Sequence, residues 1–180
     1  MTPPGTPHDQ MALAAMVAPL RRYARALCGD RWAADDLVQD TLERACTRWR
    51  LWTAGTDLRA WLFTVMHNLF IDGARRARRQ ATEPLDLEAL EQASPLSAQA
   101  TEQALDLQRC LLRLPEDQRE TLLLVTLQDL SYAQVARITG VPVGTVMSRL
   151  SRARARLREL MDGEGKAADA AIRPALRRMK

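Results

Sequence analysis

The chain has 180 residues and a formal net charge of +4, and only 4% of its residues are aromatic. This length allows one domain or two small ones. Alanine, leucine and arginine are abundant and β-branched runs are scarce, so we expect an all-α protein. Since no apolar run approaches the roughly 20 residues that span a bilayer, we expect no membrane insertion. The N-terminus, MTPPGTPHDQ, also lacks the basic and apolar regions of a signal peptide. We therefore expect a cytoplasmic protein.

The N-terminal half predicts three helices after an arm. Residues 1–10 contain three prolines and no periodicity, which indicates a disordered arm. Helical periodicity then covers residues 11–28, 33–49 and 58–79, with breaks at Gly29-Asp30 and over residues 51–57. The third helix ends in an arginine cluster, made of Arg75, Arg76, Arg78 and Arg79. Cations suit a helix C-terminus, but four arginines in five residues exceed what capping requires.

One face of the second predicted helix is polar. Its members are spaced i, i+3, i+4 and i+7, and they are Asp36, Gln39, Asp40 and Glu43. This spacing places them on one side of a helix. The pattern fits either a partner-binding face or an acidic face that is merely solvated.

The middle of the chain is acidic. Residues 80–117 contain eight acids and two arginines, whereas arginine clusters lie on both sides. Helical periodicity is lost over residues 80–100, which indicates an extended linker. It returns at residue 101, and Pro115 opens another helix with acids in its first turn. We expect two helical domains, residues 11–79 and 101–161, joined by an acidic linker over 80–100 and followed by a tail over 162–180.

The segment from Ser131 to Met161 predicts a helix-turn-helix. Ser131 and Gln134 form a capping-box pattern, Gly140 suits a turn with positive φ, and Val146 can dock the second helix on the first. The second helix is rich in arginine, which neutralises phosphates and can bond guanine edges bidentately. Turn, caps and basic face together favour DNA binding over a solvated basic helix.

Catalytic and metal-binding patterns do not stand out. No histidine–carboxylate pair, metal-ligand spacing or phosphate-binding glycine loop is evident, so we expect neither an enzyme nor a cofactor. Cys28, Cys46 and Cys110 form no C-x-x-C pair, and we expect buried free thiols.

Three motifs resemble one family in the right order. DDLVQDTLERA is similar to the core-binding helix of region 2 of extracytoplasmic-function (ECF) sigma factors. WLFTVMHNLFIDGARRARR resembles their −10 recognition helix. The stretch from LPEDQRE to SRARARL resembles region 4, which reads the −35 element. The resemblance covers about residues 11–161. The chain is thus identified as a candidate minimal, two-domain ECF sigma factor.

The resemblance implies roles for individual residues. The polar face Asp36, Gln39, Asp40 and Glu43 would contact the clamp helices of the largest subunit of core RNA polymerase. Promoter contacts in the −10 element would come from Trp52, Asn68, Asp72, Arg75, Arg76, Arg78 and Arg79. Contacts in the −35 element would come from Thr145, Ser148, Arg149, Ser151, Arg152, Arg154 and Arg156. Met147 departs from the family, which often has a basic residue there; it could contact a thymine methyl instead. Trp52 fits base stacking and core packing equally well.

The resemblance also implies partners. A sigma factor would bind core RNA polymerase as a monomer, place its domains on promoter DNA, capture melted bases and be controlled by an anti-sigma factor. Two alternatives remain open at this stage. One is a stand-alone helix-turn-helix regulator, which would leave the N-terminal helices without a task. The other is a sigma mimic that sequesters an anti-sigma factor.

Overall fold

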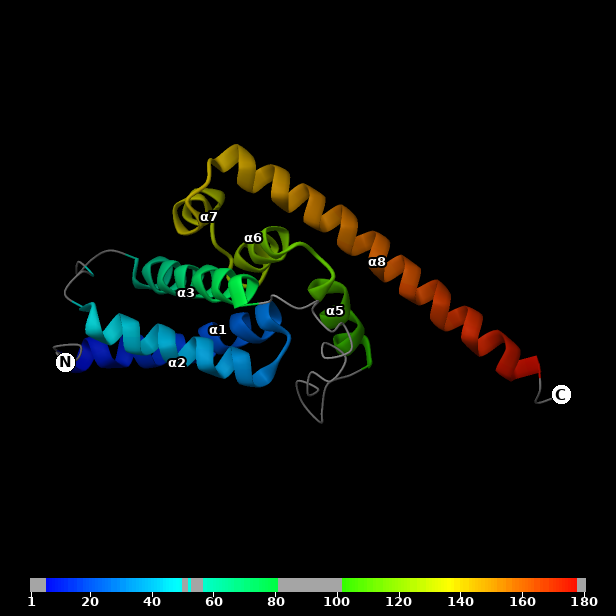
Figure 1. The fold of residues 1–180 in the computed structure, drawn as a ribbon, viewed down its shortest axis with the longest axis horizontal. Coiled ribbons are helices and arrows are strands. Elements are labelled where there is room, and N and C mark those ends of the chain that lie inside the picture. Colours follow the sequence, from blue (N-terminus) through cyan, green and yellow to red (C-terminus); the bar gives the residue numbers. More distant parts are fainter. Residues whose placement is uncertain (1–5, 50–51, 53–56, 81–101, 178–180) are drawn as a thin grey trace.

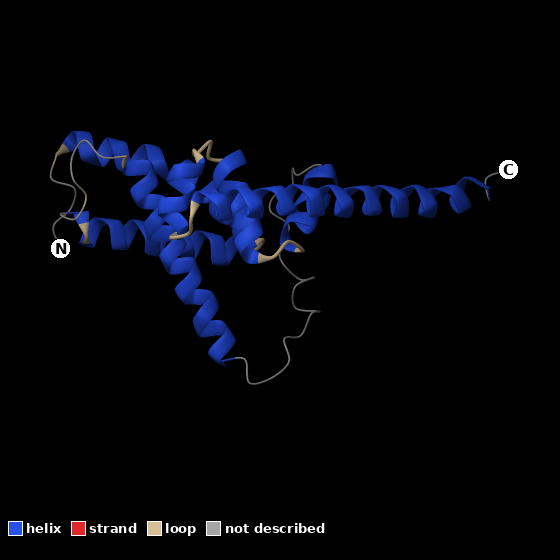
Figure 2. Cartoon of the chain, turned by 90° about the horizontal axis from the view of Figure 1, so that it is seen from above, coloured by secondary structure: helices blue, strands red, loops and turns tan. Residues whose placement is uncertain are grey.

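A computed structural model describes residues 6–49, 52, 57–80 and 102–177. All the regular secondary structure in these ranges is helical, as expected (Figure 2). The helices are α1 (Pro7–Cys28), α2 (Arg31–Thr47), α3 (Leu58–Gln80), α5 (Glu102–Leu112), α6 (Glu116–Thr126), α7 (Tyr132–Thr139) and α8 (Val143–Arg177). The predicted linker, apart from Gln80 at the end of α3, lies outside the described residues.

The first helix begins before the predicted boundary. Thr6 caps α1 and forms a reciprocal capping box with Asp9, while Pro7 occupies the first turn. Proline is tolerated there because its missing N–H would have no intrahelical partner. Residues 7–10 are therefore helical, and the expectation of a disordered arm was wrong for them. The first five residues lie outside the described part of the chain.

Helices α1, α2 and α3 pack together as the N-terminal domain (Figure 1). Gly29 ends α1 in the left-handed region at φ 77°, and Asp30 then caps α2 through the Ala33 amide at 2.7 Å. Their buried faces meet around Tyr23 and Phe63, whose rings form an edge-to-face pair with centroids 5.1 Å apart. This geometry is a favoured one for aromatic pairs.

The C-terminal domain contains the predicted helix-turn-helix. Ser131 and Gln134 form the capping box, and Gly140 adopts φ 67° at the end of α7. Val146 is fully buried where α8 docks on the preceding helices. The backbone of α8 continues to Arg177, so the helix extends well past Met161, where the tail was expected to begin. Figure 1 shows this helix projecting away from the rest of the chain.

The two domains are not separate in this structure. Helix α3 packs against α7, and α1 packs against α5 and α6, so one hydrophobic core runs through both domains. Polar bonds seal the contact: Arg59 Nη2 donates to Gln128 Oε1 at 3.0 Å, and Gln128 Nε2 donates to the Pro19 carbonyl at 3.3 Å. Gln128 is only 1% exposed, so these bonds satisfy a buried amide.

The structure contains one histidine–carboxylate pair that the sequence does not predict. His67 Nδ1 on α3 contacts Glu120 Oε1 on α6, and the side chains are 14% and 4% exposed. The two residues lie 53 positions apart, in different domains, and no spacing in the sequence connects them. The pair joins the two domains.

A search of the described helices for a segment with the length and apolar character of a membrane span finds none.

Candidate nucleic-acid and polymerase interfaces

The predicted polar face of α2 is open to solvent. Asp36, Gln39, Asp40 and Glu43 are all exposed, and their side chains form no hydrogen bond or ion pair with any described residue. The opposite side of α2 is buried through Ala34, Val38, Thr41 and Ala45. The neighbouring Asp35 differs, because it lies 3.2 Å from Arg21 Nε and 3.8 Å from Arg25 Nη2. Its charge is therefore compensated within the domain, whereas the charges of the polar face are not.

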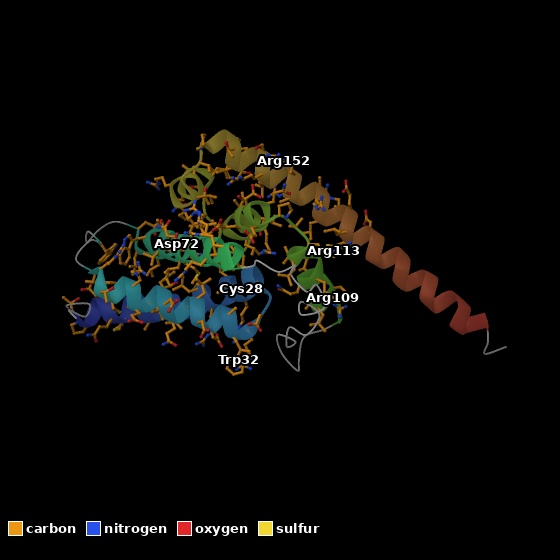
Figure 3. All side chains as sticks on the ribbon, viewed as in Figure 1. Cys28, Trp32, Asp72, Arg109, Arg113 and Arg152 are labelled. Atoms are coloured by element: carbon orange, nitrogen blue, oxygen red, sulfur yellow. The ribbon has the colours of Figure 1, made fainter. Side chains whose placement is uncertain are left out.

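The C-terminal half of α3 presents a basic stripe. At about 100° per residue, one side of the helix collects Asn68, Asp72, Arg75, Arg76 and Arg79. All five are exposed. Asp72 (labelled in Figure 3), Arg76 and Arg79 line a hollow of about 280 Å³ together with Arg44 of α2 and Leu69. The structure thus brings the predicted −10 residues of α3 together, while the side chain of Arg78 lies outside the described part.

Trp52 lies in an aromatic cluster. Its ring centroid is 4.9 Å from that of Trp49, which in turn lies 6.1 Å from Trp61. Trp52 is half-buried, and its indole Nε1 is buried with no hydrogen-bond partner among the residues that the structure describes. Packing in the core therefore explains much of the burial of this side chain. The loop residues 53–56 lie outside the described part, so base capture at this loop stays a prediction.

Helix α8, the second helix of the helix-turn-helix, has an open basic side. Ser148, Ser151, Arg152, Arg154 and Arg156 are exposed, whereas Thr145 is half-buried. Arg152 (Figure 3) is held along the helix surface: its Nε donates to the Ser148 carbonyl at 3.2 Å, and its Nη2 lies 3.3 Å from Ser148 Oγ. These bonds restrict the guanidinium before any ligand binds.

Arg149 is placed differently from the other predicted −35 residues. Its Nε lies 3.0 Å from Asp117 Oδ2 on α6, and its side chain is 22% exposed. The position is on the border between the buried and open sides of α8. In this structure the guanidinium is bound within the domain, so it supports the docking of α8 on α6.

Met147 and Val143 form an exposed apolar edge on α8. They are 53% and 42% exposed, and they lie one turn apart. Met147 borders a hollow of about 310 Å³ whose other lining residues include Tyr132, Ser151 and Arg154. An apolar group therefore lies among the basic side chains of α8.

The thiols are free, as expected, although only Cys110 is fully buried; Cys28 and Cys46 are half-buried. Burial raises the pKa of the Cys28 thiol to about 11, despite the opposing charge of Arg119. Burial also raises the pKa of Tyr23 well above its ordinary value, with Glu120 adding to the effect. A thiol with so high a pKa stays protonated and unreactive near neutrality. Within the described residues, no group of three or more His, Cys, Asp or Glu side chains could hold a metal ion.

Comparisons with known proteins first define the class. The family profile described as "Sigma2 domain of PhyR" matches residues 13–67, and that of "Sigma-70, region 4" matches residues 104–157. These two matches correspond to the N-terminal and C-terminal domains. We refer to the domains as region 2 and region 4 from this point.

The individual relatives then define the family. The chain is 39% identical over 151 residues to the ECF RNA polymerase sigma factor EcfG of Rhodopseudomonas palustris, covering 84% of this chain and 83% of that one. It is 37% identical over 142 residues to the ECF sigma factor SigM of Mycobacterium tuberculosis, covering 79% and 71%. The chain therefore belongs to the ECF sigma factor family.

Solved structures agree with this assignment. The sigma factor RpoE from Bartonella quintana, crystallised with the anti-sigma factor NepR, matches with a TM-score of 0.76 and 32% identity, covering 87% of this chain and 98% of that one. CnrH, solved with the cytosolic domain of CnrY, matches with a TM-score of 0.64 and 26% identity, covering 88% and 91%. Both structures contain a bound partner protein.

Proposed function

We propose that this chain binds core RNA polymerase and directs it to promoters by placing region 4 on the −35 element and region 2 on the −10 element. The open basic side of α8 is the observation that carries this proposal. A helix of this kind fits the major groove, where arginine can bond guanine edges and phosphates. The stripe at the end of α3 would hold the DNA backbone near the melted bases, and its contribution should fall steeply with salt.

The exposed face of α2 is the proposed docking surface for polymerase. Its acidic side chains are already in water and have no partner among the described residues, so a basic partner can pair with them without first breaking internal bonds. Charge complementarity of this kind raises association rates and selects partners. Asp40→Lys should therefore reduce the recovery of core polymerase in a pull-down, and normal recovery would refute this assignment.

The contact between the domains implies a conformational step. The −35 and −10 elements are about 25 base pairs apart, or about 85 Å at 3.4 Å per base pair. Two domains that share one core cannot reach both elements, so the promoter-bound form must separate region 4 from region 2. We propose that polymerase selects the open form. Since relatives have been solved with NepR and CnrY, we also propose that an anti-sigma factor controls this chain.

Run-off transcription tests the proposal. Core polymerase with this chain should initiate from a defined start site on promoter fragments, and core polymerase alone should not. Arg152→Ala should reduce initiation in the same assay. The proposal fails if the chain neither associates with core polymerase nor changes where RNA synthesis begins.

A sigma mimic is the second candidate, because the region 2 match is to a domain of PhyR. The anti-anti-sigma factor PhyR of Bartonella quintana, solved with the anti-sigma factor NepR, shares the fold, with a TM-score of 0.56 and 15% identity. A mimic would bind an anti-sigma factor but would not support initiation, so the same assay separates the two functions. The basic side of α8 favours the sigma factor. We further propose that the chain acts as a monomer in the cytoplasm, where promoters are, and performs no covalent chemistry.

A further inference from the structure

We propose that Trp32 is an aromatic anchor for core RNA polymerase that extends the docking face of α2 by one turn toward its N-terminus. The partner would be a basic helical surface of the largest subunit, which presents a cationic side chain or its apolar stem to the indole. This inference rests on the proposed function, because it takes the polar face of α2 as the docking surface.

Helix geometry places Trp32 on that face. Asp36, Gln39, Asp40 and Glu43 follow it by 4, 7, 8 and 11 residues. At about 100° per residue, the five side chains lie within an arc of about 100° on one side of α2. The buried residues of the helix, which include Ala34 and Val38, lie on the opposite side. Trp32 is thus the first member of a continuous stripe.

No contact within the described part of region 2 explains the choice of tryptophan at this position. Trp32 is 71% exposed, and it makes no ring contact with another described aromatic residue, whereas Trp49, Trp52 and Trp61 form a cluster. Asp30 already caps the helix, and tryptophan is a poorer helix former than alanine. The side chain exposes a large apolar surface in water, which is a cost in a free monomer and an advantage at an interface.

The stripe combines two chemistries that one partner can satisfy. Carboxylates at positions 36, 40 and 43 favour a basic surface. An indole binds arginine or lysine through cation–π contact and also covers their apolar stems. Tryptophan is enriched among the residues that dominate binding energy, and it buries about 150–250 Å² when covered. A surface of arginines and lysines on the polymerase would therefore engage the whole stripe.

The domain packing leaves this stripe accessible. Figure 3 shows Trp32 at the edge of the molecule, away from α7 and α8. Region 4 packs on region 2 through α1 and α3, not through the exposed face of α2. Polymerase could therefore first engage α2 while the domains are still in contact.

The test compares the affinities of full-length variants for core RNA polymerase, measured by competition with a labelled reference sigma factor. Trp32→Ala should weaken binding by about tenfold or more. Trp32→Phe should retain most of the affinity, because it keeps an aromatic face. Met11→Ala is the matched control: Met11 is 72% exposed near the start of α1, and its loss should change affinity by less than about twofold. Thermal melting checks that all variants fold.

Asp40→Lys distinguishes the role of Trp32 from the proposed function of the polar face of α2. If Asp40→Lys weakens binding and Trp32→Ala does not, the docking face stands and the role of Trp32 is wrong. If neither variant weakens binding, both fail. If only Trp32→Ala weakens binding, the indole acts apart from the acidic face, and the inference as stated is overturned.

Photocrosslinking provides a second readout. A benzoylphenylalanine at position 32 should form a covalent adduct with the largest polymerase subunit, whereas the same residue at position 11 should not. An adduct with a different subunit, or none under conditions where the labelled chain supports transcription, would overturn the inference.

Discussion

The inner and outer sides of region 2 use polar residues in opposite ways. On the inner side, facing region 4, His67 contacts Glu120, and Arg59 bonds Gln128, all within the chain. On the outer side, Asp36 and Asp40 stand in water with no partner among the described residues. Buried polar groups must be satisfied internally, whereas exposed ones can await another molecule. The contrast supports the proposal that the chain completes one interface by itself and offers the other to polymerase.

Phe63→Ala should have the largest effect, because it removes an inner side chain that is 1% exposed and pairs with Tyr23. Loss of a buried phenylalanine typically costs about 3–5 kcal/mol of unfolding free energy. Urea denaturation would measure it. The matched outer variant Trp32→Ala should change the unfolding free energy by about 0.5 kcal/mol or less. Similar costs for the two variants would contradict the distinction between the two sides.

Alkaline pH should also act on the inner side. The pKa of Cys28 is raised to about 11, so its folded form favours the neutral thiol. The resulting stabilisation is fully present below the ordinary thiol pKa of about 8.5–9 and is lost as pH rises through about 11. This shift of two pKa units corresponds to a loss of at most about 3 kcal/mol of unfolding free energy over the interval.

Unfolding free energies at pH 8, 9.5 and 11 would test this sign. Cys28→Ala should lose less stability than the parent chain over this interval, because the alanine cannot ionise. Tyr23 remains in both proteins, and burial and Glu120, the largest causes of its raised pKa, are also unchanged; only the smaller contribution of the Cys28 charge to that pKa is lost in the variant. Parallel curves for the two proteins would show that the thiol does not contribute.

Much of the fold is determined by residues that lie close together in the sequence, and that part is predictable. The capping box of Ser131 with Gln134 and the turn at Gly140 are encoded within ten residues, and the structure has both. The sequence does not predict the start of α1, because three prolines near the N-terminus are typical of disorder, whereas Pro7 follows the cap Thr6 and opens the helix. The domain contact could not be read at all, since Gln128 bonds Pro19 across 109 positions.

The exposure of the candidate site was partly predictable. Helical spacing placed the polar face of α2 on one side of its helix, and the family resemblance supplied the residues of the α3 stripe. Both groups are exposed in the structure, and their contacts with partners stay predictions. Trp32, which we propose as a further member of the α2 face, is not among the residues predicted from the sequence, although its offset of four residues from Asp36 is a usable signal. The setting of Arg149 depends on Asp117 of another helix, and periodicity alone does not report such a partner.

Arg152→Ala should act on the outer surface of region 4. The guanidinium is exposed and already bonded to Ser148, so its loss removes a restrained donor and should leave the fold intact. If it contacts base edges, binding to −35 promoters should weaken by about 1–3 kcal/mol. Holoenzyme affinity for promoter fragments with and without the −35 element would measure this. An equal loss on both fragments would assign Arg152 to the backbone rather than to the bases.

Arg149→Ala should have the smallest effect on promoter binding. It tests whether Arg149 serves a contact within the chain or a contact with DNA. Its guanidinium is paired with Asp117, and such a partly exposed pair contributes about 0.2–1 kcal/mol to stability. A double-mutant cycle with Asp117→Ala should return a coupling in this range, and promoter binding should fall less than in Arg152→Ala. If instead Arg149→Ala weakens −35 binding as much as Arg152→Ala and shows no coupling to Asp117, the guanidinium leaves α6 in the promoter complex. Arg149 would then be one of the side chains that contact DNA.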